Sequence, residues 1–171
     1  GPLTADDFRG KAPANSTGAA RTSTQLRFTY RYSYQVRDAQ TTLNLESVTI
    51  DAYVRRDESW NSRPDDKNLL EHEQGHADIA WIQCLKARIA LHDRIHNERT
   101  WTVTAPTLEE AAAKLEKELT DRLKAFEKAG READAEYDRE TRHGLGARQT
   151  EWRRVQVETI KRLQAEWNER L

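Results

Sequence analysis

Cysteine and methionine are nearly absent from this sequence, which has one cysteine and no methionine. Because Cys84 stands alone, an intramolecular disulfide is excluded, which suits the cytosol and is also compatible with the periplasm. No apolar run approaches the roughly 18 residues that a transmembrane helix needs, so we expect no membrane span. The chain starts at Gly1-Pro2, and we therefore expect a processed or trimmed chain whose signal peptide is already removed.

Net charge is also nearly absent, because 28 basic residues stand against 29 acidic ones and leave a formal charge of -1. This balance provides no electrostatic attraction to nucleic acid or to an anionic membrane, so we expect neither as a partner. The 171 residues, without an internal repeat or a low-complexity tract, are enough for one domain with a real core. We therefore predict a single domain over residues 1–171, and the oligomeric state stays open.

Strict alternation of apolar and polar residues predicts a half-buried strand over residues 25–37. Its apolar face consists of Leu26, Phe28, Tyr30, Tyr32, Tyr34 and Val36. A second strand follows over residues 43–55, and its apolar phase slips by one residue near Ser47, which indicates a β-bulge. A polar break separates the two strands, so we predict a long antiparallel hairpin. Residues 1–24 are rich in Gly, Pro, Ser, Thr and Ala, and we expect irregular structure there.

A helical pattern follows the hairpin. Pro64 is placed as a first helical residue and has two acidic residues directly after it, which predicts a helix that continues to about His96. A β-rich stretch over residues 100–104 interrupts this pattern. Thr107 and Glu110 then form a capping box for a second long helix.

The second helix has Gly130 as a possible kink, ends near Arg142 and is followed by a turn over residues 143–146. A stripe of large residues predicts the last helix, and it consists of Trp152, Gln156, Ile160, Leu163 and Trp167. The order of elements indicates an α+β fold with more helix than strand.

The segment with most chemical information is His72-Glu73-Gln74-Gly75-His76. Four residues on an α-helix turn through about 400°, so the two imidazoles lie one turn apart on one face and can bind the same ion. Neutral imidazole suits zinc, and Glu73 next to the first histidine is placed to act as the general base toward a zinc-activated water. Gly75 is unfavourable inside a helix, and its missing side chain lets a neighbouring segment approach the metal-binding helix. His92 and His96 have the same spacing without the glutamate, and we interpret them as a surface pair.

Three stretches of sequence, one of which contains the His72–His76 motif, together indicate a family resemblance. They are Leu3-Thr4 with Asp7-Phe8 and Gly10; Leu69-Leu70-x-His72-Glu73-Gln74-Gly75-His76-x-Asp78-Ile79; and Tyr137-Asp138-x-Glu140-Thr141-x-His143-Gly144, followed by Gln149 and Trp152. With these stretches the chain resembles a bacterial family of uncharacterised proteins described as predicted secreted zinc-dependent proteases. Ala77 departs from the aromatic residue that the family usually has there, a difference that concerns packing rather than metal chemistry. The resemblance implies a secreted or periplasmic protein.

The resemblance also directs attention to residues 137–143 for the third metal ligand. We favour His143, because a turn residue beside Gly144 is free to face the metal, and Glu140 and Asp138 are the alternatives. His143 has a second interpretation as a cap of a helix C-terminus. Tyr137 is our candidate hydrogen-bond donor to the oxyanion of a tetrahedral intermediate, and a half-buried packing role is its alternative.

These observations predict a zincin-like metallopeptidase, in which a long hairpin packs against a metal-binding helix and two further long helices. His72, His76 and His143 would bind Zn²⁺, Glu73 and Tyr137 would be catalytic, and the substrate would be a peptide or a protein. The alternatives are a non-catalytic, zinc-stabilised helical binding module and a zinc hydrolase of another amide. Glu73 favours an enzyme, because a structural zinc site has four protein ligands and needs no acid at that position.

Overall fold

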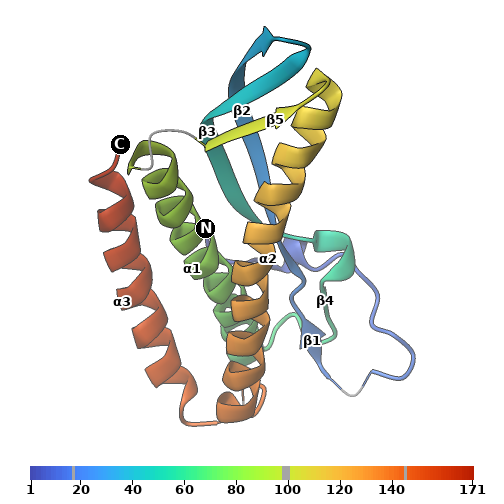
Figure 1. Cartoon of the computed structure of the whole chain (residues 1–171). Helices are drawn as coiled ribbons and strands as arrows, with labels where there is room; N and C mark the ends of the chain where they lie inside the picture. Colours follow the sequence, from blue (N-terminus) through green and yellow to red (C-terminus); the bar gives the residue numbers. More distant parts are fainter. Residues whose placement is uncertain (17, 98–100, 145) are drawn as a thin grey trace.

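The computed structural model describes residues 1–16, 18–97, 101–144 and 146–171, and these residues form an α+β fold (Figure 1). Three long helices pack beside a three-stranded antiparallel sheet, which confirms the predicted α+β class and the predicted order of hairpin and helices. The helices are α1 (Lys67–Asn97), α2 (Leu108–Thr141) and α3 (Gln149–Asn168). The strands of the larger sheet are β2 (Thr24–Arg37), β3 (Gln40–Val54) and β5 (Trp101–Ala105), in the spatial order β2-β3-β5.

The hairpin of β2 and β3 closes through a two-residue turn between Arg37 and Gln40. Asp38 and Ala39 both have positive φ, 49° and 57°, as a type I′ turn requires to match the twist of the flanking strands. The register shifts between Arg31 and Tyr32, opposite residues 45–47 of β3, which confirms the bulge expected near Ser47. β3 begins three residues before the predicted start at position 43, because pairing with β2 extends to the turn.

Alternation along β2 buries one face only where another element covers it. Leu26 is buried, and Phe28, Tyr30 and Tyr32 are partly buried against the core. Farther along the same strand, Tyr34 is 53% exposed and Val36 is 63% exposed. The end of the hairpin projects past the helices (Figure 1), so the predicted half-buried strand is correct for the first part of β2 and wrong for its end.

The β-rich stretch after α1 forms the third strand of the sheet. Trp101, Val103 and Ala105 of β5 alternate as buried residues and pair with the first part of β3. The buried face of α2 packs on this sheet and makes the main core with it; its residues are Ala111, Leu115, Leu119 and Leu123. The core therefore joins the hairpin, β5 and the first half of α2 around α1. The C-terminal half of α2 lies outside this core and approaches the histidines of α1.

Two helix predictions need correction or refinement. α1 begins at Lys67 rather than at Pro64, because Asp66 is the residue that caps it: its Oδ1 accepts the backbone N–H of Leu69 at 3.1 Å. α2 begins as predicted, with the Thr107 hydroxyl accepting the Glu110 N–H, and it is continuous through Gly130.

The first 24 residues are mostly irregular, as expected, but they include two short elements. The 3₁₀ turn η1 (Ala5–Asp7) comes first, and strand β1 (Ala20–Arg21) pairs antiparallel with β4 (Trp60–Asn61). A second 3₁₀ turn, η2 (Arg56–Glu58), precedes β4. None of the helices in the described ranges combines the length and the apolar character needed to cross a membrane.

Candidate metal centre

Helix α1 places the two motif histidines side by side, as the four-residue spacing predicts. The Nε2 atoms of His72 and His76 are 3.3 Å apart. His72 is buried, and the side chain of His76 is only 13% exposed. Glu73 is also buried, at 2% exposed, on the same part of the helix. Two imidazoles and a carboxylate are therefore held close together at a site that solvent reaches from one side.

The C-terminal part of α2 adds two carboxylates to these histidines. Oδ1 of Asp138 lies 3.0 Å from His72 Nε2 and 3.2 Å from His76 Nε2. Oδ1 of Asp134, one helical turn earlier, lies 2.9 Å from His76 Nδ1. One aspartate therefore faces the nitrogens that point into the site, and the other binds the outer nitrogen of His76.

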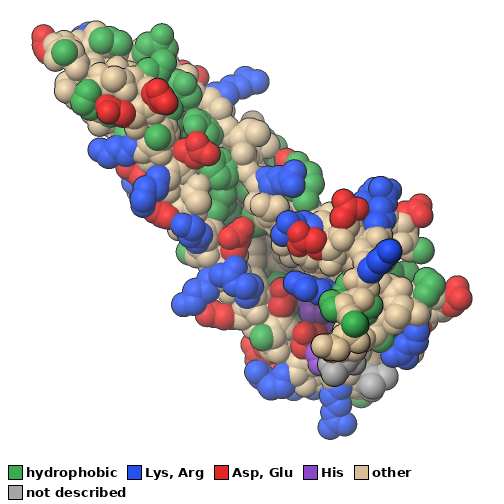
Figure 2. Space-filling model, turned by 90° about the vertical axis from the view of Figure 1, so that its right-hand side faces the viewer, with side chains coloured by type: hydrophobic (Ala, Val, Ile, Leu, Met, Phe, Trp, Pro, Cys, Tyr) green, Lys and Arg blue, Asp and Glu red, His purple; other side chains and the backbone are tan. Residues whose placement is uncertain are grey.

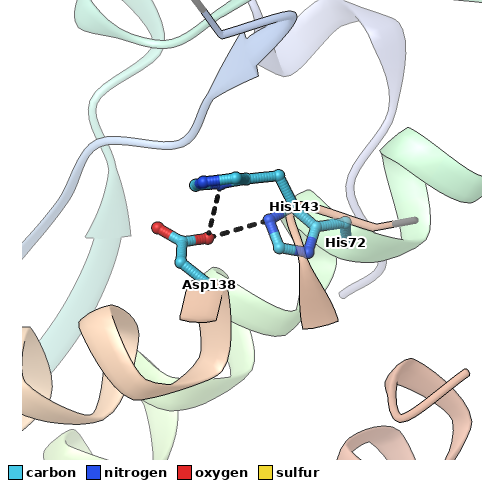
Figure 3. A group of neighbouring side chains, drawn as sticks. All are labelled: His72, Asp138 and His143. Carbon is cyan, nitrogen blue, oxygen red and sulfur yellow. Dashed lines mark hydrogen bonds and ion pairs between the residues drawn. The ribbon is translucent and has the colours of Figure 1, made fainter. Parts of the chain in front are cut away.

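His143 reaches the same aspartate from the turn after α2. Its Nδ1 lies 3.3 Å from Asp138 Oδ1, and Figure 3 shows this carboxylate between the rings of His72 and His143. The turn has left-handed backbone at Arg142, His143 and Gly144, with φ of 51°, 53° and 87°, which directs His143 back toward α1. The side chain of His143 is nevertheless 76% exposed. His72, Asp138 and His143 have potential ligand atoms within 4.8 Å of one another, so this group could hold a metal ion.

The spacing of the donor atoms fits such an ion. The atoms His72 Nε2, His76 Nε2 and Asp138 Oδ1 form a triangle with edges of 3.0, 3.2 and 3.3 Å. Ligand atoms about 2.0 to 2.1 Å from a tetrahedral ion are about 3.3 Å from each other. The three atoms therefore match one face of a tetrahedral coordination sphere without rearrangement of the backbone.

Thr22, which no sequence motif indicated, is hydrogen-bonded to Glu73 of the motif. Its hydroxyl donates to Glu73 Oε2 at 2.6 Å, across 51 residues of sequence. Thr22 lies between the short strand β1 and strand β2, in the part of the chain where we expected irregular structure. One oxygen of Glu73 is thus oriented by a neighbour, and nothing in the local sequence around Thr22 indicated this role.

Tyr137 lies on the other side of the motif. Its ring stacks on His72, with centroids 4.8 Å apart and planes 12° from parallel, and its hydroxyl donates to the main-chain carbonyl of His72 at 3.2 Å. Tyr137 is 1% exposed, so its hydroxyl is directed to the backbone of α1 and not to solvent. This position corresponds to the packing interpretation of Tyr137.

Glu140, one of the alternative ligands, is bonded elsewhere. Its Oε2 accepts the indole N–H of Trp152 at 2.8 Å and lies 3.5 Å from a guanidinium nitrogen of Arg148. The carboxylate therefore connects α2 to α3. Of the three ligand candidates from residues 137–143, Asp138 and His143 lie at the site and Glu140 does not.

The charges at the site are strongly coupled. Burial opposes the charged form of His76, but hydrogen bonds to Asp134 and Asp138 outweigh it and raise the pKa of His76 to about 10. Burial also raises the pKa of Asp138, whereas hydrogen bonds from His72 and His76 and nearby positive charge hold it well below its usual range. The two aspartates therefore favour the charged form of His76.

An open cleft of about 650 Å³ gives access to this cluster. One wall is formed by β1 and Thr22, another by Trp60 and the start of α1, and the last by the turn that contains His143. Figure 2 shows histidine side chains in this part of the surface, bordered by acidic and basic side chains. The two motif histidines, Asp138 and Glu73 therefore line a cleft that is open to solvent.

His92 and His96 lie elsewhere on α1. Their rings are 4.1 Å apart, and His92 also contacts Trp167 of α3 edge-on. Both oxygens of the intervening Asp93 are bound by Arg170. This second histidine pair is thus separate from the candidate metal centre; His96 is exposed, as predicted for a surface pair, whereas His92 is half-buried against α3.

No family model, curated protein or solved structure matches the chain. The family resemblance therefore depends on the three stretches of sequence alone.

Proposed function

We propose that the protein is a zinc-dependent metallopeptidase, in which His72, His76 and Asp138 hold the ion. The observation that supports this most directly is the triangle of their donor atoms at the base of an open cleft. Two imidazoles and one carboxylate are a ligand set that catalytic zinc uses, with one position left for water or substrate. We now favour Asp138 over His143 as the third ligand, because its one oxygen faces both imidazole nitrogens while His143 is mostly exposed.

The bound ion would lower the pKa of a water molecule and polarise the carbonyl of the scissile amide. Glu73 is the general base in this proposal. Its Oε2 accepts the hydroxyl of Thr22, which leaves its other oxygen to take a proton from the attacking water and later to give it to the leaving amine. Burial of Glu73 keeps the carboxylate in one orientation.

Asp134 and Tyr137 hold the histidines in position. Asp134 accepts a hydrogen bond from Nδ1 of His76. This bond keeps the proton of the neutral imidazole on Nδ1, so that Nε2 carries no proton and is free to bind the ion. Tyr137 holds the His72 ring between its own ring and the site, and it is bonded to the backbone of the same residue. The side chain with a free path to the substrate is that of His143, so we assign to His143, in place of Tyr137, the donor to the developing oxyanion.

The second candidate is a non-catalytic zinc-stabilised module. The observation in its favour is the approach of His143 Nδ1 to within 3.3 Å of Asp138 Oδ1, because a small ring movement would make His143 a fourth ligand. Four protein ligands close the coordination sphere and exclude catalysis. The position of Glu73, buried beside the ligands and oriented by Thr22, supports the enzyme.

One experiment tests the proposal directly. The zinc-reconstituted protein is incubated with a diverse peptide library, and the cleaved bonds are identified by mass spectrometry. We expect about one zinc ion per chain and cleavage that chelator abolishes and that Glu73→Gln lowers by several orders of magnitude. Glu71→Gln is the matched control, because Glu71 is exposed on the same helix one residue before His72. Stoichiometric zinc with no cleavage of any peptide would favour the non-catalytic module.

A further inference from the structure

The carboxylates that line the cleft all have partners within the protein. Asp138 faces three histidines, Asp134 binds His76, and Glu73 accepts the hydroxyl of Thr22. The fourth, Asp66, caps α1 and lies 3.7 Å from a guanidinium nitrogen of Arg63. Asp134 and Asp138 therefore face histidines and Asp66 faces a guanidinium, whereas Glu73, whose partner is a neutral hydroxyl, keeps its negative charge.

Two arginines of the same cleft have no such partner. Arg21 belongs to β1 on one wall, and Arg142 is the left-handed residue that ends α2 on the wall beside His143. Both side chains are exposed, and within the described ranges neither guanidinium has an ion pair, a hydrogen bond or a ring contact. Arg63, which is itself 61% exposed, adds a third guanidinium at the rim with a loose ion pair. Guanidinium charge without a carboxylate partner is therefore present on two walls of the cleft.

We infer that the cleft selects peptides with Asp or Glu side chains next to the scissile bond, and that Arg21 and Arg142 are the residues that determine this specificity. The inference rests on the proposed function, because it names the substrate class of that site. Guanidinium groups bind carboxylates in a planar, two-pronged geometry, and both arginines line the cleft from backbone that the fold holds in place. Arg21 is held by the pairing of β1 with β4, and Arg142 by the left-handed cap of α2.

A binding experiment tests the specificity separately from catalysis. The protein is the full chain with Glu73→Gln, reconstituted with zinc, so that peptides bind without being cleaved. The probes are fluorescent, C-terminally amidated peptides of one sequence that carry Asp, Asn or Lys on both sides of a central apolar pair. We expect the Asp peptide to bind about 10-fold more tightly than the Asn peptide at low salt, with the Lys peptide weaker still. Because exposed charges are screened, the preference should decrease as salt rises.

Variants of the two arginines complete the test. Arg21→Gln together with Arg142→Gln should reduce the difference between Asp and Asn peptides to less than about 2-fold, and Arg21→Glu should shift the preference toward the Lys peptide. The control is Arg37→Gln, which removes an exposed arginine at the tip of the hairpin and should change nothing. All of these positions are exposed, so thermal unfolding should be nearly unchanged.

Equal binding of Asp and Asn peptides, including failure of both to bind, would overturn the inference. A preference that survives in the double arginine variant would overturn it too. A free-acid version of the Asn peptide distinguishes side-chain carboxylates from a C-terminal carboxylate, and binding of that peptide alone would contradict the assignment. A different result would contradict the proposed function but not the inference about binding. In that result acidic peptides bind through the two arginines, but the zinc-loaded wild-type protein cleaves none of them.

Discussion

Tyr137 occupies the space in which a side chain at Gly75 would lie. A Cβ atom at position 75 would overlap the Tyr137 hydroxyl and the ring carbons next to it, with Cε1 only 2.7 Å away. The glycine that is unfavourable inside α1 thus allows α2 to approach that helix closely. Asp138, the next residue of α2, reaches the histidines because of this contact.

Substitution of Gly75 tests this relationship. Gly75→Ala should lower the free energy of unfolding by about 1 to 3 kcal/mol, the usual range for overpacking, and should also weaken zinc binding because α2 must move. Urea denaturation and zinc titration measure the two effects. Gly130→Ala is the matched control: a Cβ there would meet only a flexible carbon of Gln83 at 3.4 Å, so stability should be unchanged or rise by up to about 1 kcal/mol. Equal effects at the two glycines would show that the contact is unimportant.

The third ligand can be identified by comparing two substitutions. Asp138→Asn should weaken zinc affinity by at least about 100-fold, because it removes an anionic ligand. His143→Ala should change zinc affinity by less than about 3-fold and lower hydrolysis by about 100-fold, the usual effect of losing one oxyanion donor. His96→Ala serves as the control and should leave both quantities unchanged. If His143→Ala lost the metal as completely as Asp138→Asn, His143 would be a ligand, and the zinc site would be closed.

Removal of the second carboxylate should weaken the metal centre more moderately. Asp134→Asn leaves an amide that cannot favour the required form of His76, so zinc affinity should fall by about 10- to 100-fold. Competition with a chromogenic chelator measures this change. Glu136→Gln, at an exposed position two residues along α2, is the control. An unchanged affinity in Asp134→Asn would mean that the hydrogen bond to His76 does not support the ligand.

The hydroxyl of Thr22 should matter for turnover more than for metal binding. Thr22→Val keeps the shape of the side chain but removes the donor to Glu73, so kcat should fall by about 10-fold or more, as expected for a hydrogen bond to a charged group. Thr22→Ser should retain most of the rate, because it keeps the hydroxyl. Zinc content should be the same in all three proteins, and a serine variant as slow as the valine variant would show that packing, rather than the hydrogen bond, is important.

The metal-free protein should lose stability as the pH rises. The pKa of His76 is raised from 6.5 to about 10 in the folded state, so its stabilising effect is complete below pH 6.5 and is lost as the pH rises to about 10. The pKa of Asp138 is lowered instead, so its effect is present above pH 3.8 and is lost on acidification below that value. Zinc binding requires loss of the second proton of His76. Binding at neutral pH should therefore release this proton, and the zinc affinity should increase as the pH rises.

Urea denaturation of the apoprotein at several pH values, and zinc calorimetry in buffers of different ionisation enthalpy, measure these effects. His76→Gln should remove most of the decline in apoprotein stability between pH 6.5 and 10. An apoprotein with constant stability over this range would contradict a protonated His76.

The sequence alone determined the features that depend on local periodicity. Alternation identified the hairpin and its bulge, and the four-residue spacing on a helix placed His72 and His76 on one face. The cost of a glycine inside a helix indicated that Gly75 lets another segment come close. Each of these features is a property of a single element, whose geometry follows from the backbone repeat.

Tertiary structure decided what joins these elements at the site. Asp134 and Asp138 come from a helix about 60 residues away, and Thr22 comes from a segment 51 residues before Glu73. Their positions depend on how α2 packs against α1 through Tyr137 and Gly75, and on the pairing of β1 with β4. The exposure of Tyr34 and Val36 has the same cause, because strand alternation defines a face and only neighbouring elements can cover it. Long-range packing of this kind leaves no periodic mark in the sequence, so only the folded chain brings these side chains together.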